Sequence, residues 1–280
     1  MDRNVQTFIA CDKEYNDSRI VIFGAPFDST TSYRPGARFA PGAIRNESYG
    51  IETYSLYQDM DLEDTLVFDG GDIELPFGNP VPAIDMIEKF TGDILNDGKF
   101  PFMIGGEHLV TLGAVRAVAE KYENLHIIHF DAHADLRNDY LGMELSHACV
   151  MRRCHEITGD GKIFQFGIRS GDRQEIEWGR KHVNTCRFNF DTLDNVVGQL
   201  EDVPVYFTID LDILDPSEFP GTGTPEAGGV SFIELLGAVR KVAGLNIVGM
   251  DMVELSPVYD SSGISTALAC KLLREILLLL

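Results

Sequence analysis

The sequence predicts an α/β protein with a mostly parallel sheet that is covered by helices on both faces. Two observations support this fold class. Short apolar runs alternate with helical stretches along all 280 residues. The stretch VPAIDMIEKFTGDIL repeats apolar residues at three- and four-residue steps, as an amphipathic helix does. Strands separated by helices of this length indicate βαβ crossovers, which build parallel sheets.

The apolar runs place the expected strands at 19–24, 66–69, 100–105, 125–131, 162–168, 203–210 and 245–253. The expected helices cover 41–50, 82–97, 108–122, 173–181, 231–243 and 263–279. No internal repeat, low-complexity tract or Pro/Ser-rich linker interrupts this pattern. We therefore expect one domain over residues 1–280.

The charge balance narrows the choice of partners. With 23 basic and 44 acidic residues, the formal net charge is −21. Such a chain repels phosphate backbones and anionic membranes, so we expect neither nucleic acid nor membrane as a partner, whereas cations are attracted. The N-terminus shows no secretory signal pattern, and no apolar run reaches the roughly 20 residues that span a bilayer. Five cysteines without a C-x-x-C pair favour free thiols in a reducing cytoplasm.

Polar residues gather where the predicted strands end. Gly105-Gly106-Glu107-His108 follows one strand, the run 131–135 (DAHAD) follows the next, and 210–212 (DLD) follows a third. Asp251 and Glu254 close a fourth strand. Open α/β sheets bind ligands outside the carboxyl ends of their strands, so we expect these residues to share one rim.

The spacing within these motifs indicates metal binding. In an extended backbone Asp131, His133 and Asp135 point to one face and the intervening alanines to the other. Asp210 and Asp212 alternate in the same way. Several buried carboxylates are costly unless a cation neutralises them. The plain alternatives are a solvated loop for the first motif and a turn or helix cap for the second.

His108 completes a set of two imidazoles and four carboxylates, because the glycine pair before it allows a tight strand-to-helix turn. Mixed imidazole and carboxylate ligands without thiolate suit Mn²⁺. Six ligands suit two ions that share a bridging carboxylate and a bridging water, which can be hydroxide at neutral pH. The expected metal ligands are His108, Asp131, His133, Asp135, Asp210 and Asp212.

The other histidines are expected to play lesser parts. His126 and His129 lie inside a strand and are expected to be core or supporting residues, and His155 and His182 are expected at the surface. His147 follows the loop 138–146, which should hang over the rim. A mobile histidine there could transfer protons, and helix capping is the alternative.

Six ordered motifs resemble the ureohydrolase (arginase–agmatinase) family, and the resemblance covers almost the whole chain. They are GGEH (105–108), DAHAD (131–135), SHA (146–148), TIDLDILDP (208–216), GTGTPEAGG (221–229) and DMVELSP (251–257). The segment 24–45 is similar to agmatinases in particular. Many relatives carry Asp where this chain has Glu107, a position not expected to bind metal.

The resemblance implies an arginase-like, three-layer α/β/α sandwich with two Mn²⁺ per subunit. One ion would lie near His108, Asp131, Asp135 and Asp210, and the other near Asp131, His133, Asp210 and Asp212. It also implies a cytoplasmic homo-oligomer, either a trimer or a hexamer.

The implied reaction is the hydrolysis of agmatine, a cationic guanidino compound, to putrescine and urea by a metal-bridging hydroxide. Glu254 would pair with the guanidinium nitrogens. Asp135 would carry a proton to the leaving amine, and His147 would exchange protons with bulk water and contact substrate. Asp172 could contact the distal ammonium, with helix capping as its alternative. Arg137 could instead recognise a carboxylate, which leaves guanidinobutyrate open.

Three further alternatives remain. An arginase would need small polar residues after the second aspartate of DAHAD, where this chain has RNDYLG (137–142). A binuclear metallophosphoesterase would need further Asn and His ligands late in the chain. A non-catalytic ureohydrolase-like scaffold would not need all six ligands together with His147 and Glu254.

Overall fold

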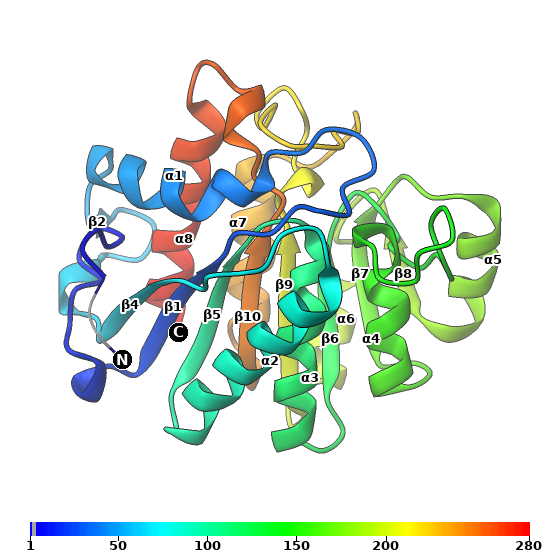
Figure 1. Ribbon diagram of the computed structural model, residues 1–280, viewed down its shortest axis with the longest axis horizontal. Helices are drawn as coiled ribbons and strands as arrows, with labels where there is room; N and C mark the ends of the chain where they lie inside the picture. The colour runs from blue at the N-terminus through cyan, green and yellow to red at the C-terminus, as the bar shows by residue number, and fades with distance from the viewer. Residues whose placement is uncertain (2–3) are drawn as a thin grey trace.

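The centre of the molecule is an eight-stranded sheet in which every strand pair is parallel (Figure 1). The computed structural model describes residue 1 and residues 4–280. The strand order across the sheet is β4-β1-β5-β10-β9-β6-β7-β8. The strands are β1 (Ile20–Ala25), β4 (Val67–Asp72), β5 (Phe100–Gly105), β6 (His126–Phe130), β7 (Ile163–Ile168), β8 (Asn184–Arg187), β9 (Val205–Asp210) and β10 (Ile247–Val253). A separate antiparallel pair joins β2 (Tyr54–Ser55) to β3 (Met60–Asp61).

Helices cover both faces because successive strand side chains point to opposite sides. Ile20 and Ile22 pack in one apolar core, and Val21 and Phe23 pack in the other. The first core contains residues of α1 (Ala40–Glu47), α6 (Leu193–Gln199), α7 (Phe232–Val242) and α8 (Ile264–Leu279). The second is covered by α2 (Pro80–Asn96), α3 (Thr111–Lys121), α4 (Val150–Thr158) and α5 (Arg173–His182). The expected three-layer α/β/α sandwich with a mostly parallel sheet is confirmed.

All seven predicted strands are present, whereas the strands β2, β3 and β8 and the helices α4 and α6 were not predicted. The sequence of β8, NTCR, is polar, because this strand lies at the sheet edge and its residues are exposed or half-buried. The two missed helices are only nine and seven residues long. In the described part of the chain, no helix combines the length and apolar character that crossing a membrane requires.

The central strands β5, β10, β9 and β6 end at one edge of the sheet. The turn after β5 passes so close to the turn after β1 that only glycine fits at position 106. A Cβ atom there would lie 2.0 Å from the carbonyl oxygen of Phe27. The Glu107 amide donates a hydrogen bond to the same oxygen at 2.7 Å and so joins the two turns. It places His108 over the ends of the neighbouring strands.

Candidate metal centre

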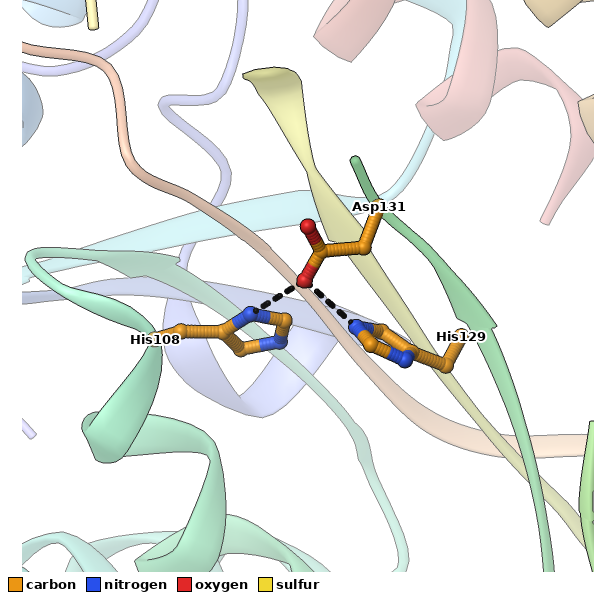
Figure 2. Close-up of side chains that lie close together, drawn as sticks. All are labelled: His108, His129 and Asp131. Atoms are coloured by element: carbon orange, nitrogen blue, oxygen red, sulfur yellow. Dashed lines mark hydrogen bonds and ion pairs between the residues drawn. The ribbon is translucent and has the colours of Figure 1, made fainter. Parts of the chain in front are cut away.

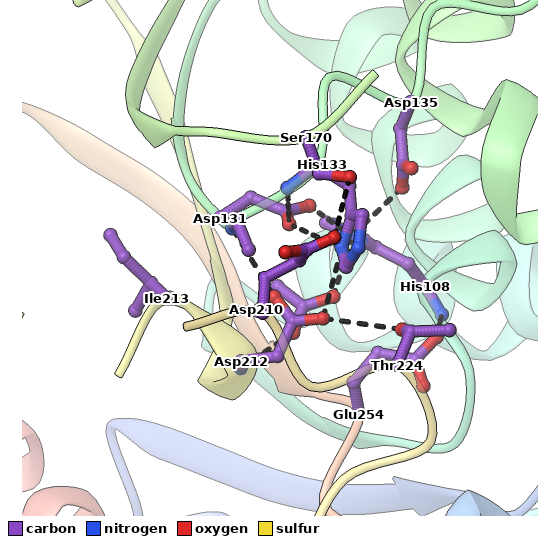
Figure 3. Close-up of polar contacts among 12 residues, drawn as sticks. His108, Asp131, His133, Asp135, Ser170, Asp210, Asp212, Ile213, Thr224 and Glu254 are labelled. Carbon is purple, nitrogen blue, oxygen red and sulfur yellow. Dashed lines mark hydrogen bonds and ion pairs between the residues drawn. The ribbon is translucent and has the colours of Figure 1, made fainter. Parts of the chain in front are cut away.

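The structure brings all six predicted metal ligands together at the carboxyl ends of β5, β6 and β9 (Figure 3). His108 begins a 3-10 turn after β5, and Asp210 is the last residue of β9. Five of the six side chains are buried, and His133 is half-buried. Asp135 adopts a left-handed backbone with φ 52°, an unusual conformation for a residue other than glycine.

The Nδ1 ring nitrogen of His108 faces three carboxylates. Its Nδ1 lies 3.1 Å from Asp131 Oδ2 and 3.3 Å from both Asp135 Oδ2 and Asp210 Oδ2. Nδ1 is buried and has no hydrogen-bond partner among the described residues. A lone pair facing three carboxylate oxygens is the arrangement that a bound cation stabilises.

The other ring nitrogen carries the hydrogen of the neutral imidazole, which leaves Nδ1 available for a proton or a cation. His108 Nε2 lies 3.0 Å from Thr208 Oγ1, and that hydroxyl donates to Asp251 Oδ1 at 2.5 Å. Because the only hydroxyl hydrogen goes to Asp251, the Thr208 oxygen must accept the hydrogen of Nε2. Tyr206 donates to the second Asp251 oxygen at 2.6 Å. This buried chain holds the imidazole in the tautomer that a metal ligand needs.

His133 defines a second position beside the first. Its Nδ1 lies 3.0 Å from Asp212 Oδ2 and 3.5 Å from Asp131 Oδ1. Asp131 therefore directs one oxygen towards His108 and the other towards His133, as a carboxylate shared by two cations would. Backbone amides hold the carboxylates in place, since the amide of Asp212 donates to Asp210 Oδ1 at 2.8 Å.

His129 supports the site from behind Asp131, in keeping with its expected place as a core or supporting residue. Gln165 Nε2 donates to the Ala134 carbonyl at 2.7 Å and lies 3.0 Å from His129 Nδ1, so this ring nitrogen accepts. The proton is then on Nε2, which lies 2.7 Å from Asp131 Oδ2 (Figure 2). His129 thus donates to the carboxylate rather than offering a lone pair to a metal. Its position two residues before Asp131, on the same face of the strand, was the only available sequence signal.

The site carries negative charge that its own residues do not balance. Burial, followed by repulsion from Asp212 and Asp131, raises the pKa of Asp210 well above its ordinary value. Burial opposes protonation of His108, but Asp131, Asp135 and Asp210 raise the pKa of its imidazole well above the ordinary value. Asp210 and His108 therefore tend to hold protons, and these protons offset the negative charge that bound cations would otherwise neutralise. Two imidazoles and four carboxylates fit divalent cations such as Mn²⁺.

Glu254 and His147 lie against the same rim. Glu254 has φ 66°, accepts the His108 amide at 2.8 Å and lies 3.5 Å from His147 Nδ1. The His147 ring neither caps a helix nor hangs in solvent, because it is buried and Nε2 accepts the Ser32 amide at 3.0 Å. Burial opposes a second proton, but Glu254 and then Asp135 raise the pKa of His147 to about 9. Taking that proton at Nε2 requires the contact with the Ser32 amide to break, whereas the Ser32 hydroxyl oxygen, 2.9 Å from Nε2, can accept the new hydrogen.

Glu107 has a structural part that the sequence did not indicate. It is fully buried, and its carboxylate accepts the amide and hydroxyl of Thr30 and the hydroxyl of Thr31. The Thr30 hydroxyl oxygen in turn accepts the His147 amide at 3.1 Å. Glu107 therefore ties the loop after β1 to the segment that carries His147.

A cavity of about 320 Å³ opens above the metal ligands, and its lining includes Asp135, Arg137, His147, Asp172 and Glu175. Arg137 lies 3.2 Å from Asp172 Oδ2 and 3.6 Å from Glu175 Oε1. Asp172 Oδ1 also accepts the Glu175 amide at 2.9 Å, so the expected alternative of a helix N-cap is present. Burial is the main cause that raises the pKa of Glu175 to about 7.

Comparison with known proteins identifies the family. A protein-family model described as Arginase family matches residues 18–279 of this chain. An agmatinase of Bacillus subtilis (strain 168) is 47% identical over 277 residues, covering 98% of this chain and 96% of that protein. The solved structure of a candidate agmatinase from Clostridium difficile has a TM-score of 0.92 and 50% identity, covering 95% of this chain and 98% of that one. The solved structure of the agmatine ureohydrolase of Thermoplasma volcanium has a TM-score of 0.90 and 34% identity, covering 99% of this chain and 94% of that one. The chain therefore belongs to the arginase family.

Proposed function

We propose that this protein hydrolyses agmatine to putrescine and urea, as an agmatinase-type amidinohydrolase with two Mn²⁺ per subunit. The observation that carries the proposal is the buried His108 Nδ1, which faces three carboxylate oxygens at 3.1–3.3 Å beside Glu254. The agmatinase of Bacillus subtilis, similar over nearly its full length, supports the same reaction.

The residues that would hold one ion are His108, Asp131, Asp135 and Asp210, and the other ion would be held by Asp131, His133, Asp210 and Asp212. Asp131 and Asp210 would be shared. Bound divalent cations supply a strong water-derived nucleophile at neutral pH and stabilise negative charge that develops during hydrolysis.

The remaining residues of the rim would bind and orient the substrate. A guanidinium is planar, so a carboxylate that accepts two of its N–H groups fixes both its position and its plane. Glu254 is suited to this role because its backbone conformation and the His108 amide hold its carboxylate at the rim. Asp135 would carry a proton to the departing amine nitrogen, and His147 would exchange protons through its ring nitrogens.

The charges of the cavity favour a cationic tail. Four acidic residues line the cavity, Asp135, Asp172, Glu175 and Asp210. Among the described lining residues, Arg137 is the only basic side chain apart from the two histidines. Arg137 is already paired with the Asp172 carboxylate at 3.2 Å, so its charge is not free for a substrate carboxylate. This supports agmatine over guanidinobutyrate or arginine.

We extend the proposal to the whole protein. Residues 1–280 would act as one catalytic domain within a cytoplasmic homo-oligomer, a trimer or a hexamer. The family match over 18–279 supports the single domain. All five cysteines are free, which is compatible with a reducing compartment.

The test is urea release from agmatine, arginine and guanidinobutyrate with Mn²⁺ and then with a chelator. We expect agmatine to be the best substrate, with activity lost on chelation and restored by Mn²⁺. Asp131→Asn and Asp212→Asn should abolish urea release, whereas Asp93→Asn on the exposed face of α2 should not. Urea release from none of the three substrates would refute the proposed function.

His147 needs a separate measurement. His147→Ala should lower the turnover number and alter its pH dependence while two Mn²⁺ still bind. Full activity across pH in this variant would remove the proton-transfer role without affecting the proposed metal site.

A further inference from the structure

Two histidines that are far apart in the sequence meet at one aspartate on the surface. His155 Nε2 and His182 Nδ1 each lie 2.7 Å from Asp160 Oδ1. One ligand atom from each of the three residues lies within 4.8 Å of the other two. We propose that His155, Asp160 and His182 form a second, peripheral site for a divalent transition metal, with Zn²⁺ as the best-suited ion.

The backbone holds Asp160 between the two histidines. The amide of Gly159 donates to the His155 carbonyl at 2.7 Å, and the amide of Gly161 donates to the His182 carbonyl at 2.8 Å. Both glycines have positive φ, 87° and 74°, which a tight turn of this kind requires. The aspartate is therefore attached on both sides to the segments that carry its partners.

An aromatic side chain supports both imidazoles from behind. Trp178 stacks on His182 with 4.3 Å between ring centroids, and its ring meets His155 edge-on at 4.7 Å. Arg152 covers the Trp178 ring at 3.7 Å. These contacts limit the rotation of the rings, so less conformational entropy is lost when an ion binds.

The helix ends at the site favour a cation, although Arg180 and Lys181 also lie in the last turn of α5. α4 ends at Thr158 and α5 ends at His182, so two helix C-termini, each with partial negative charge, adjoin the carboxylate of Asp160. Imidazole ligands prefer zinc, copper and nickel over Mn²⁺, which distinguishes this site from the carboxylate-rich centre. Three protein ligands leave a fourth zinc position for water.

Binding needs only small local changes. In the metal-free arrangement each histidine donates a ring hydrogen to Asp160. When an ion binds, each neutral imidazole carries its hydrogen on the other ring nitrogen, and the freed lone pair binds the metal. No net charge has to be created on either ring. Asp160 is exposed, so its side chain can rotate to make room.

The peripheral site is separate from the candidate metal centre. The α5 helix begins at Asp172 and Arg173 beside the cavity, and its ten residues span about 15 Å before His182. α4 likewise starts just after His147 and ends before Asp160. Both helices thus run from the catalytic rim to the peripheral site, along the β7 and β8 side of the sheet (Figure 1).

The experiment counts zinc bound per subunit by equilibrium dialysis with Zn²⁺, in wild type and in a His155→Ala/His182→Ala double variant. Asp160→Asn keeps both rings, and His126→Ala serves as a matched histidine control. We expect the double variant to lose one zinc equivalent and the control to lose none. Asp160→Asn should weaken binding at this site alone. Urea release with Mn²⁺ should remain unchanged in all three variants, so loss of the peripheral site is distinguishable from failure of the proposed function.

Equal zinc stoichiometry in wild type and the double variant would overturn the proposal. If the double variant does not fold, Asp160→Asn decides the question, because it removes only a carboxylate charge at an exposed position. Unchanged zinc affinity in Asp160→Asn would then overturn the proposal. Zinc X-ray absorption of the wild type should show one more histidine-rich ion than that of the variant.

Discussion

The hydroxyl of Thr208 is expected to control metal affinity without touching a metal. Thr208→Val keeps the shape of the side chain but removes an oxygen that contacts His108 Nε2 at 3.0 Å and Asp251 at 2.5 Å. All three residues are fully buried. Each buried polar group left without its partner costs about 1–3 kcal/mol, so the two together predict a loss of about 2–6 kcal/mol in unfolding free energy.

The same substitution releases the tautomer of His108. Loss of such a supporting hydrogen bond commonly weakens metal binding about 10- to 100-fold. We therefore expect Mn²⁺ affinity to fall by that factor in Thr208→Val, measured from the free Mn²⁺ signal in electron paramagnetic resonance titrations. Urea unfolding of the chelated protein measures the stability loss separately.

Thr208→Ser is the matched control, because it retains the hydroxyl and loses only a methyl group. It should bind Mn²⁺ like the wild type. Equal Mn²⁺ affinity in the Val and Ser variants would refute the reasoning. A loss of stability in Thr208→Val without a loss of Mn²⁺ affinity would show that the hydroxyl stabilises the fold but does not control metal binding.

Three further predictions concern charge and proton binding. Because burial raises the pKa of Glu175 from 4.5 to about 7, the folded protein holds a proton that the unfolded chain has released between these values. Stability should therefore fall as pH rises through this window, by up to about 3 kcal/mol from this group, and urea unfolding of Glu175→Gln should lack that contribution. Arg137→Leu should leave the KM for agmatine unchanged or lower, since it removes a positive charge from the cavity; a large rise in KM, with loss of any guanidinobutyrate hydrolysis, would favour the guanidino-acid alternative. Mn²⁺ affinity should decrease as pH falls, because protons held by His108 and Asp210 compete with the ion, and calorimetric titrations that gave the same affinity at every pH would contradict this.

The fold was predictable because its elements are regular. Parallel strands buried on both faces are mostly apolar along their length, and seven such runs stand out in the sequence. The exceptions have physical causes. β8 pairs with only one neighbour at the exposed edge of the sheet and needs no apolar run. α4 has two arginines, a histidine and a glutamate among nine residues, which obscures its apolar face.

The candidate site was predictable as far as local spacing reaches. Alternation placed Asp131 and His133 on one face, and the strand-end rule brought them to Asp210 and His108. Asp135 joins them through a left-handed backbone conformation that alternation does not predict. Contacts across long sequence separations could not be inferred in this way. Ser32 meets His147 across 115 residues, and Thr30 meets Glu107 across 77.

By itself, the sequence determined the α/β fold, the rim on which the ligands lie and their chemical types, because periodicity and strand ends are local properties. The tertiary structure decided which atoms face one another. It directs His129 as a donor to Asp131, holds His147 in a buried contact, and joins His155 to His182 across 27 residues of chain. Such pairings depend on how whole helices and strands pack, and no short segment of sequence encodes that geometry.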